Sequence, residues 1–247
     1  MAQKIAFITG GNRGLGFQTA LELGMAGVKV IIGARNLVNG GRALERLREA
    51  GVDADVLQFD VTTSEHHKAA FDYFSFNFGL LDILVNNAGI AGGTFPGTGP
   101  EHSASEVSMS LLHRVFVTNF FAQVALTQTM LPLIKKSPAG RIVNLSSILG
   151  SLTLQADPDS PIYDAKSFAY DASKTALNAF TIHLAYELRD TNIKVNSAHP
   201  GWVKTDMGGP QATMELSEGA RTSAVLATLP DDGPSGGYFH LGRPLPW

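Results

Sequence analysis

The sequence contains no cysteine, which excludes disulfide bonds and thiolate chemistry and fits a cytoplasmic location. Charged residues make up only 17% of the 247 residues, the net charge is −3, and lysines and arginines form no cluster. We therefore expect no nucleic-acid partner. The histidines are scattered except for His66 and His67, which diverge on a presumed helix, so we expect no metal site.

Charge is also missing from residues 115–134, a stretch long enough to span a membrane. Its polar side chains argue against that interpretation, because Asn119, two glutamines, three threonines and Pro132 would all lie inside the bilayer. A helix buried inside a soluble protein has the same pattern. We therefore expect a core helix and no membrane partner.

Short apolar segments alternate with helical patterns along the chain, and no linker divides it. We expect strands at 4–9, 28–33, 54–59, 81–86, 141–146, 193–198 and 237–241. We expect helices at 15–26, 43–50, 64–78, 115–134, 170–189 and 217–229. This alternation predicts one doubly wound, Rossmann-like α/β domain over 1–247, with a central parallel sheet of about seven strands and helices on both faces. Such sheets bind ligands beyond the carboxyl ends of their strands.

A glycine-rich segment, T-G-G-N-R-G-L-G at 9–16, directly follows the first expected strand and opens the first helix. Gly10 permits a tight turn, and Gly14 and Gly16 allow a phosphate and the strand to approach the helix closely. The N–H groups of the helix N-terminus can then bind a pyrophosphate. Glycines in a tightly packed turn would look the same, but the strand before and the helix after favour a dinucleotide site.

No aspartate or glutamate occurs between Glu22 and Glu45, where a dinucleotide site would place an acid for the ribose 2′-hydroxyl. The second strand instead leads to Arg35, and the glycine loop carries Arg13. Guanidinium groups suit a 2′-phosphate through paired N–H donors. The alternative is that both arginines are only solvated. The pattern predicts NADP(H) in preference to NAD(H).

Two further motifs follow strands, N-N-A-G at 86–89 and Ser147 in S-I-L-G, and a third, Y-D-A-S-K at 170–174, opens the expected helix at 170–189. With the glycine loop, these motifs make the chain resemble the short-chain dehydrogenase/reductase family, and H-P-G-W-V-K-T-D-M-G-G-P at 199–210 is similar to its carbonyl-reductase branch. The resemblance implies a nicotinamide-dependent oxidoreductase whose catalytic residues are Asn119, Ser147, Tyr170 and Lys174. The cofactor-binding residues that we expect are Gly10, Asn12, Arg13, Gly14, Leu15, Gly16, Arg35, Asp60, Val61, Asn87, Ala88, Gly89, Pro200, Gly201, Val203 and Thr205.

Carbonyl reduction needs a hydride at carbon and a proton at oxygen, and Tyr170 is the expected proton donor. A free tyrosine has a pKa of about 10, so we expect the Lys174 ammonium and an oxidised nicotinamide to lower this pKa by about three units, or roughly 4 kcal/mol. Ser147 would bond the substrate oxygen in an oxyanion-type role. Asn119 would hold a water that links Lys174 to solvent; a capped or kinked buried helix is the alternative interpretation.

A near-copy of this motif, Tyr163 with Lys166, precedes the pair of Tyr170 and Lys174. Spacings of three and four residues both place side chains on one helix face, so spacing alone does not decide between the pairs. Context does, because a long helical pattern continues from Tyr170 whereas Tyr163 follows the loop sequence D-P-D-S-P. We therefore assign the acid to Tyr170.

The spacing from Ser147 to Tyr170, 170 − 147 = 23 residues, is longer than is usual in the family. We expect an insertion-like loop at 150–169, which puts the family's usual oligomers in doubt, and a substrate lid at 200–216. The expected pocket residues are Leu149, Leu154, Trp202 and Met207, with Leu152 and Phe168 nearby. Their apolar character favours an apolar aldehyde or ketone.

The sequence thus predicts NADPH-dependent reduction of a small carbonyl compound, an aldehyde or ketone. Two alternatives stay open: an NAD(P)⁺-dependent alcohol dehydrogenase that works toward oxidation, and a protein that senses NADP(H) without catalysis. The second alternative would not need the tyrosine and the lysine, yet both are present.

Overall fold

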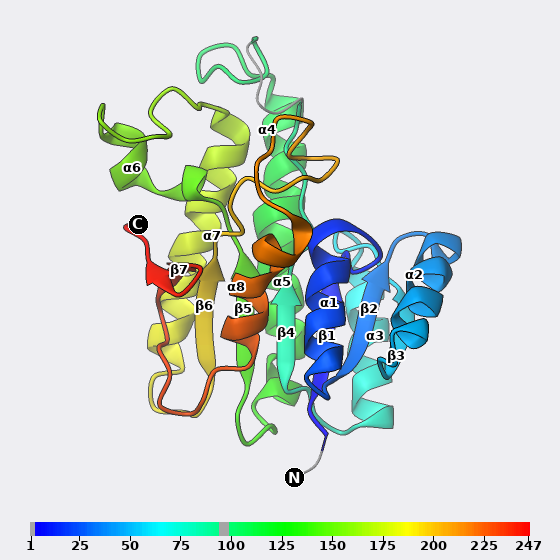
Figure 1. Ribbon diagram of the computed structural model, residues 1–247. Coiled ribbons are helices and arrows are strands. Elements are labelled where there is room, and N and C mark those ends of the chain that lie inside the picture. Colours follow the sequence, from blue (N-terminus) through cyan, green and yellow to red (C-terminus); the bar gives the residue numbers. More distant parts are fainter. Residues whose placement is uncertain (1–2, 94–98) are drawn as a thin grey trace.

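The computed structural model describes residues 3–93 and 99–247, which form one sheet of eight strands in the order β3-β2-β1-β4-β5-β6-β7-β8 (Figure 1). The strands are β1 (Ile5–Thr9), β2 (Lys29–Ala34), β3 (Ala54–Gln58), β4 (Ile83–Asn86), β5 (Arg141–Leu145), β6 (Lys194–Ala198), β7 (Tyr238–His240) and β8 (Arg243–Pro244). All neighbours pair in parallel except β7 and β8. The predicted doubly wound α/β fold is confirmed, and each expected strand lies within two residues of its predicted ends.

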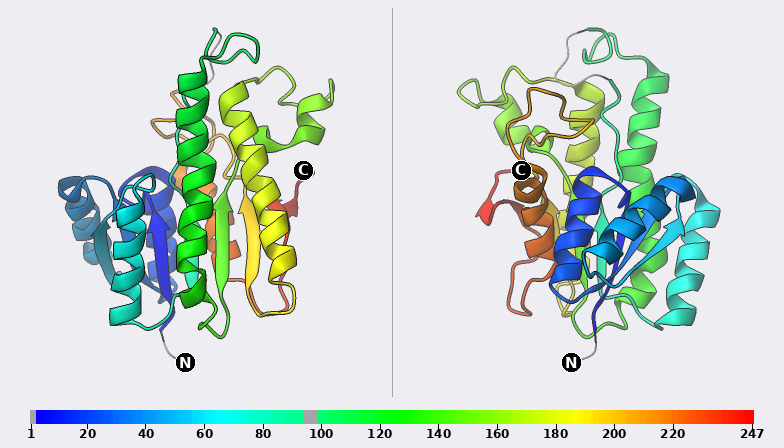
Figure 2. Two further views of the ribbon diagram at one scale, coloured as in Figure 1. Left: turned by 180° about the vertical axis from the view of Figure 1, so that it is seen from behind. Right: turned by 45° about the vertical axis from the view of Figure 1, so that its right-hand side comes forward.

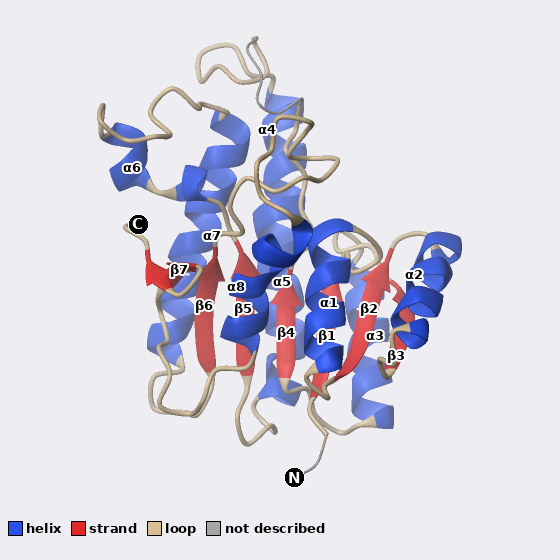
Figure 3. Ribbon diagram, in the orientation of Figure 1, coloured by secondary structure: helices blue, strands red, loops and turns tan. Residues whose placement is uncertain are grey.

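Helices cover both faces of this sheet (Figures 2 and 3). They are α1 (Gly14–Met25), α2 (Leu37–Glu49), α3 (Ser64–Asn77), α4 (Met109–Phe116), η1 (Val117–Phe121), α5 (Ala122–Ile134), η2 (Ile148–Gly150), α6 (Leu152–Ala156), α7 (Phe168–Glu187) and α8 (Leu216–Ala227). Successive strand residues point to opposite faces, so Phe7 joins the core beneath α3, α5 and α7 while Ile8 joins the core beneath α1, α2 and α8. The buried strands therefore read as continuous apolar runs.

Several elements of the fold differ from the sequence-based expectation, and α2 and α4 begin six residues before the predicted starts at 43 and 115. The antiparallel β8 was not predicted, because it has only two residues and is formed by a tight turn with positive φ at Leu241 (46°) and Gly242 (79°). The expected loop at 150–169 contains the short helix α6, whose first turn is capped by the Ser151 hydroxyl as it accepts the Leu154 N–H at 3.2 Å. Helix α7 also begins at Phe168, two residues earlier than expected.

The long apolar helix runs without a break through α4, η1 and α5, over Met109–Ile134, and by length and composition alone it could cross a membrane. A third of its most apolar window is buried (33%), including Leu126 and Met130 in the core against the sheet. Its polar residues Asn119 and Gln123 point inward and bond the backbone of residues after β4. Part of the apolar surface of this helix thus packs on the sheet, whereas Met109 and Phe121 are exposed.

Candidate active site

The glycine loop at 9–16 joins β1 to α1 at the carboxyl edge of the sheet. Gly10 (φ 63°) and Gly14 (φ 54°) adopt the left-handed conformation that other residues avoid. A Cβ at Gly16 would lie 2.5 Å from Asn87 Nδ2, so only glycine fits there. Helix α1 begins without a side-chain cap and without an acid in its first turn, which leaves its N–H donors available to an anion.

The residues after β4 hold this loop in place. The Asn87 side chain donates to the Thr9 carbonyl at 2.7 Å, and the N–H groups of Asn87 and Ala88 donate to the Thr9 hydroxyl at 3.0 and 2.9 Å. The next residue, Gly89, lies near Lys174, because a Cβ there would lie 3.6 Å from Lys174 Nζ. The N-N-A-G motif therefore connects the glycine loop to the surroundings of Lys174.

The ends of β2 and β3 supply Arg35 and Asp60. Partial burial raises the pKa of Asp60, but the N–H and hydroxyl of Thr62, with the charges of Arg35 and His66, outweigh it and hold the pKa below its usual value. Val61 is buried beside Asp60. Arg35 thus lies next to a carboxylate at the edge of the sheet, and its side chain is exposed.

The segment 200–216 folds over the glycine loop from the other side. Arg13 forms an ion pair with Asp206 across this contact at 2.5 Å, and a Cβ at Gly14 would lie 3.7 Å from the Thr205 methyl group. Val203 pairs with Met214 within the segment. Of the two arginines expected at a 2′-phosphate, Arg13 is therefore bonded to the lid in this structure.

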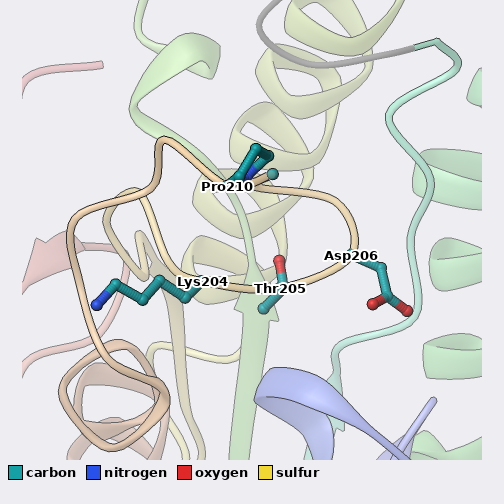
Figure 4. A pocket seen from close by; sticks show the side chains of 5 residues that line it. Lys204, Thr205, Asp206 and Pro210 are labelled. Atoms are coloured by element: carbon teal, nitrogen blue, oxygen red, sulfur yellow. The ribbon is translucent and has the colours of Figure 1, made fainter.

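A hollow of about 520 Å³ opens in this segment, lined by Lys204, Thr205, Asp206, Gly209 and Pro210. In Figure 4 the Lys204 and Asp206 side chains point to opposite ends of the hollow, with Thr205 between them. None of the four expected pocket residues lines it. Leu149 is fully buried, Leu154 and Trp202 are half-buried, and Met207 is exposed.

Helix α7 brings Tyr170 and Lys174 to one face beside Ser147, whose side chain hydrogen-bonds Tyr170. Burial, together with the nearby charge of Asp171, raises the pKa of Tyr170 to about 12, although the hydrogen bond from Ser147 lowers it. Burial lowers the pKa of Lys174 to about 8. Its Nζ donates to the Leu145 carbonyl at 2.7 Å and lies 5.6 Å from the centre of the Tyr170 ring.

The expected lowering of the Tyr170 pKa by about three units assumes both the Lys174 ammonium and an oxidised nicotinamide, and it stays a prediction for the protein with its cofactor bound. In the protein alone, burial of the phenol has the largest effect on its pKa, and the Lys174 ammonium donates to the Leu145 carbonyl at the end of β5. The sequence gives the identity of the two groups, but not where the lysine nitrogen is bonded.

Asn119 lies in the π-helical turn η1 and is fully buried. Its amide forms a pair of hydrogen bonds with the backbone of Ile90, both at 2.9 Å, and its Nδ2 also donates to the Ser173 hydroxyl at 3.0 Å. A Cβ at Gly89 would lie 3.3 Å from Asn119 Oδ1, so Asn119 approaches the same point as Lys174. An irregular turn in a buried helix is frequent at functional sites.

Comparison with known proteins identifies the family of the chain. The family model described as short chain dehydrogenase matches residues 4–216. The chain belongs to the short-chain dehydrogenase family. Human carbonyl reductase [NADPH] 1 is 32% identical over 281 aligned positions, covering 98% of each chain, and (+)-neomenthol dehydrogenase of Capsicum annuum is 29% identical, covering 96% of this chain and 95% of the relative. The crystal structure of NADPH-bound carbonyl reductase from chicken fatty liver superposes with a TM-score of 0.83, at 25% identity and full coverage of both chains. The protein is therefore an oxidoreductase.

Only one of the two tyrosine–lysine motifs belongs to the site of this short-chain dehydrogenase. Tyr163 is 39% exposed, and Lys166 Nζ lies 4.8 Å from the centre of its ring in a cation–π contact. Lys166 also donates to the carbonyl and side-chain oxygens of Gln155 in α6. The first motif therefore lies at the surface and bonds α6, whereas Tyr170 and Lys174 lie beside Ser147.

Two residues of this short-chain dehydrogenase site were not singled out from the sequence. A Cβ at Gly150 would lie 2.8 Å from the Lys174 backbone carbon, so the turn after Ser147 packs tightly against α7. His199 accepts the Ile148 N–H at 3.1 Å, and the only signal for it was its place in H-P-G before the lid. Within 3–93 and 99–247 no group of three histidines or acids could hold a metal.

Proposed function

We propose that this short-chain dehydrogenase reduces an aldehyde or ketone with NADPH, with Tyr170 as the general acid. The observation that carries the proposal is the convergence of Ser147, Tyr170 and Lys174 at the carboxyl edge of the sheet, next to the glycine loop. The resemblance to proteins named carbonyl reductase [NADPH] over nearly the full chain supports the same reaction. The absence of cysteine is consistent with action in the cytoplasm.

The residues of the cleft fit a dinucleotide. The uncapped start of α1 and the left-handed turn at Gly10 and Gly14 leave a cradle of N–H donors that a side chain would fill. Arg35 would bind the 2′-phosphate, and Arg13 would join it on leaving Asp206. Asp60 and Val61 would lie beside the adenine, with Pro200, Gly201 and other lid residues near the nicotinamide. NADPH supplies the hydride when it is bound.

The protonation states of the protein fit a proton donor. With its pKa raised to about 12, Tyr170 is protonated at neutral pH and can give its proton to the substrate oxygen. The Ser147 hydroxyl, already bonded to the phenol, can then donate to the oxygen on which charge develops. Lys174, 5.6 Å from the ring centre, stabilises the phenolate that remains, and Asn119 holds the water that returns a proton.

Half-buried and exposed apolar side chains around this edge favour an apolar carbonyl substrate. Trp202 and Met207 belong to the lid, and Leu154 belongs to the inserted helix α6. A substrate that lies between these segments would contact mainly carbon atoms while its oxygen faces Ser147. The inserted segment thus has a place in substrate access.

The test is a panel of aldehydes and ketones with NADPH and NADH in parallel, followed by the loss of reduced nicotinamide absorbance. We expect turnover with NADPH, and we expect Arg35→Ala to lower the preference for NADPH over NADH about 10- to 100-fold, because a charge-assisted contact contributes about 1.5–3 kcal/mol. Arg189→Ala, at an exposed arginine near the end of α7, is the matched control and should leave the preference unchanged.

Two results would contradict the proposal. Equal affinity for NADH and NADPH, or an unchanged ratio in Arg35→Ala, would overturn the cofactor assignment. Tight NADPH binding with no turnover across the whole panel would overturn the reductase assignment and favour a sensor.

A further inference from the structure

His199 is a buried titratable residue that the proposed reaction does not use. It follows the last residue of β6 and precedes Pro200, and its side chain is buried under the lid. Its backbone N–H donates to the Phe239 carbonyl at 2.8 Å, and its carbonyl accepts from His240 Nδ1 at 2.9 Å. The two imidazole rings lie 4.8 Å apart. The residue is therefore fixed by β7 on one side.

The other side of the ring faces the active site. Nδ1 of His199 accepts the N–H of Ile148 at 3.1 Å and, more weakly, the N–H of Gly201 at 3.4 Å. A backbone N–H can only donate, so Nδ1 is unprotonated and the neutral ring carries its hydrogen on Nε2. Burial, together with the neighbouring His240, lowers the pKa of His199 to about 3, which keeps the ring in this form at neutral pH.

Both donors border the proposed reacting centre. Ile148 directly follows Ser147, and Gly201 (φ 88°) begins the segment expected beside the nicotinamide. The far end of the same short turn, Gly150, packs on the backbone of Lys174, where a Cβ would lie only 2.8 Å away. The turn that carries Ser147 is thus held between α7 on one side and the His199 ring on the other.

We propose that His199 is a positioning residue, whose ring accepts the N–H groups of Ile148 and Gly201 and so fixes the Ser147 hydroxyl relative to the lid. The inference rests on the proposed carbonyl reduction, in which Ser147 bonds the substrate oxygen. A displacement of about 1 Å at a reacting group can reduce the rate about 10²-fold. Loss of the acceptor should therefore reduce turnover while the glycine loop, and with it NADPH binding, is unaffected.

The experiment compares three variants of His199 that differ in whether a hydrogen-bond acceptor lies at the position of Nδ1. Asparagine places its side-chain oxygen at the position of Nδ1, whereas glutamine places its amide near Nε2 and leucine has no acceptor. We expect His199→Leu and His199→Gln to lower kcat about 10- to 100-fold with the Kd for NADPH within about threefold, and His199→Asn to stay within about threefold of the wild type in both. In the protein without cofactor, exchange of the Ile148 amide hydrogen should accelerate in the leucine and glutamine variants only.

His183→Leu is the control, because His183 is an exposed histidine on α7 without a role in the proposed site. It should leave both kcat and the Kd for NADPH nearly unchanged. Equal kcat values for the asparagine and glutamine variants, or unchanged Ile148 exchange in the glutamine variant, would overturn the proposal. If His199→Leu does not fold, the asparagine–glutamine pair decides the question. A wild type without turnover would refute the proposed function, whereas the exchange result would still test the positioning role.

Discussion

Strand β5 lies near a buried cation at each of its ends, and the two cations are bonded very differently. At the amino end Arg141 is 1% exposed and donates five hydrogen bonds to protein oxygens. The acceptors belong to Gly140, Asn192, Leu229 and Asp231. At the carboxyl end Lys174 is 4% exposed, and its Nζ donates to the Leu145 carbonyl at 2.7 Å.

The same difference holds for neighbouring polar groups at the two edges of the sheet, seen at the bottom and top of Figure 1. At the amino edge Asp82 uses both carboxylate oxygens, one on the Ile5 N–H and one on the Ser137 hydroxyl. Toward the carboxyl edge, the Oδ1 atoms of Asp171 and Asn178 are buried without a hydrogen-bond partner in residues 3–93 and 99–247. Each such atom costs about 1–3 kcal/mol. These polar groups are therefore more fully hydrogen-bonded at the amino edge than toward the carboxyl edge.

The largest expected effect comes from removing the hydroxyl of Tyr170, the proposed general acid. Tyr170→Phe should lower kcat about 10²- to 10⁴-fold, the range of general acid catalysis, and should change stability by only about 1 kcal/mol, because the hydroxyl that it removes is hydrogen-bonded to Ser147. Steady-state rates with NADPH and a thermal melt measure both quantities. Tyr163→Phe is the matched control, since the exposed near-copy should tolerate the same change with rates within about twofold. Near-normal turnover in Tyr170→Phe would contradict the mechanism.

At the amino end of β5, a substitution of Arg141 should lower stability and leave kcat unchanged. Arg141→Leu should destabilise the protein by about 3–5 kcal/mol, because it leaves the carbonyl groups of Gly140, Asn192 and Leu229 without the guanidinium donors that they now accept. The remaining folded fraction should keep its kcat, since Arg141 lies at the edge away from the cleft. Urea denaturation with activity assays on the folded protein gives both values. Lys68→Met, at an exposed i,i+4 pair with Asp72, is the control and should change stability by no more than about 0.5 kcal/mol.

The sequence predicts the strands and the glycine loop better than the hydrogen bonds and protonation states of side chains at the edges of the sheet. Strand positions follow from apolar runs, and the glycine loop follows from spacing, because each depends on nearby residues. The strand β8 and the helix α6 were missed because a turn and a single Ser151 cap determine them. The protonation of Tyr170 and the contact of His199 depend on tertiary burial, the latter across 51 positions to Ile148, so no local pattern contains them.

The smallest expected effect is a change in the pH dependence of stability, and it concerns Lys174. Its pKa is about 8 in the folded protein and 10.5 as an ordinary lysine, so between these values the unfolded chain binds the proton and the folded chain does not. Stability should therefore rise with pH in this window, and over pH 8 to 10 the rise amounts to at most about 3 kcal/mol. Above about 10 the raised pKa of Tyr170 acts in the opposite direction, because the folded protein then holds the phenol proton more tightly than the unfolded chain.

Lys174→Met should remove this rise while it abolishes turnover, and at pH 7.5 the variant should be at least as stable as the wild type, because methionine fills the site without a buried charge. The loss of the hydrogen bond to Leu145 offsets about 1 kcal/mol of that gain. Urea denaturation at pH 7.5, 8.5 and 9.5 measures the slope, and Lys135→Met, at an exposed position, should retain it. If the unfolding free energy of Lys174→Met still rises with pH, the rise does not come from Lys174. Burial of this lysine would then not lower stability, and the contrast with Arg141 would fail.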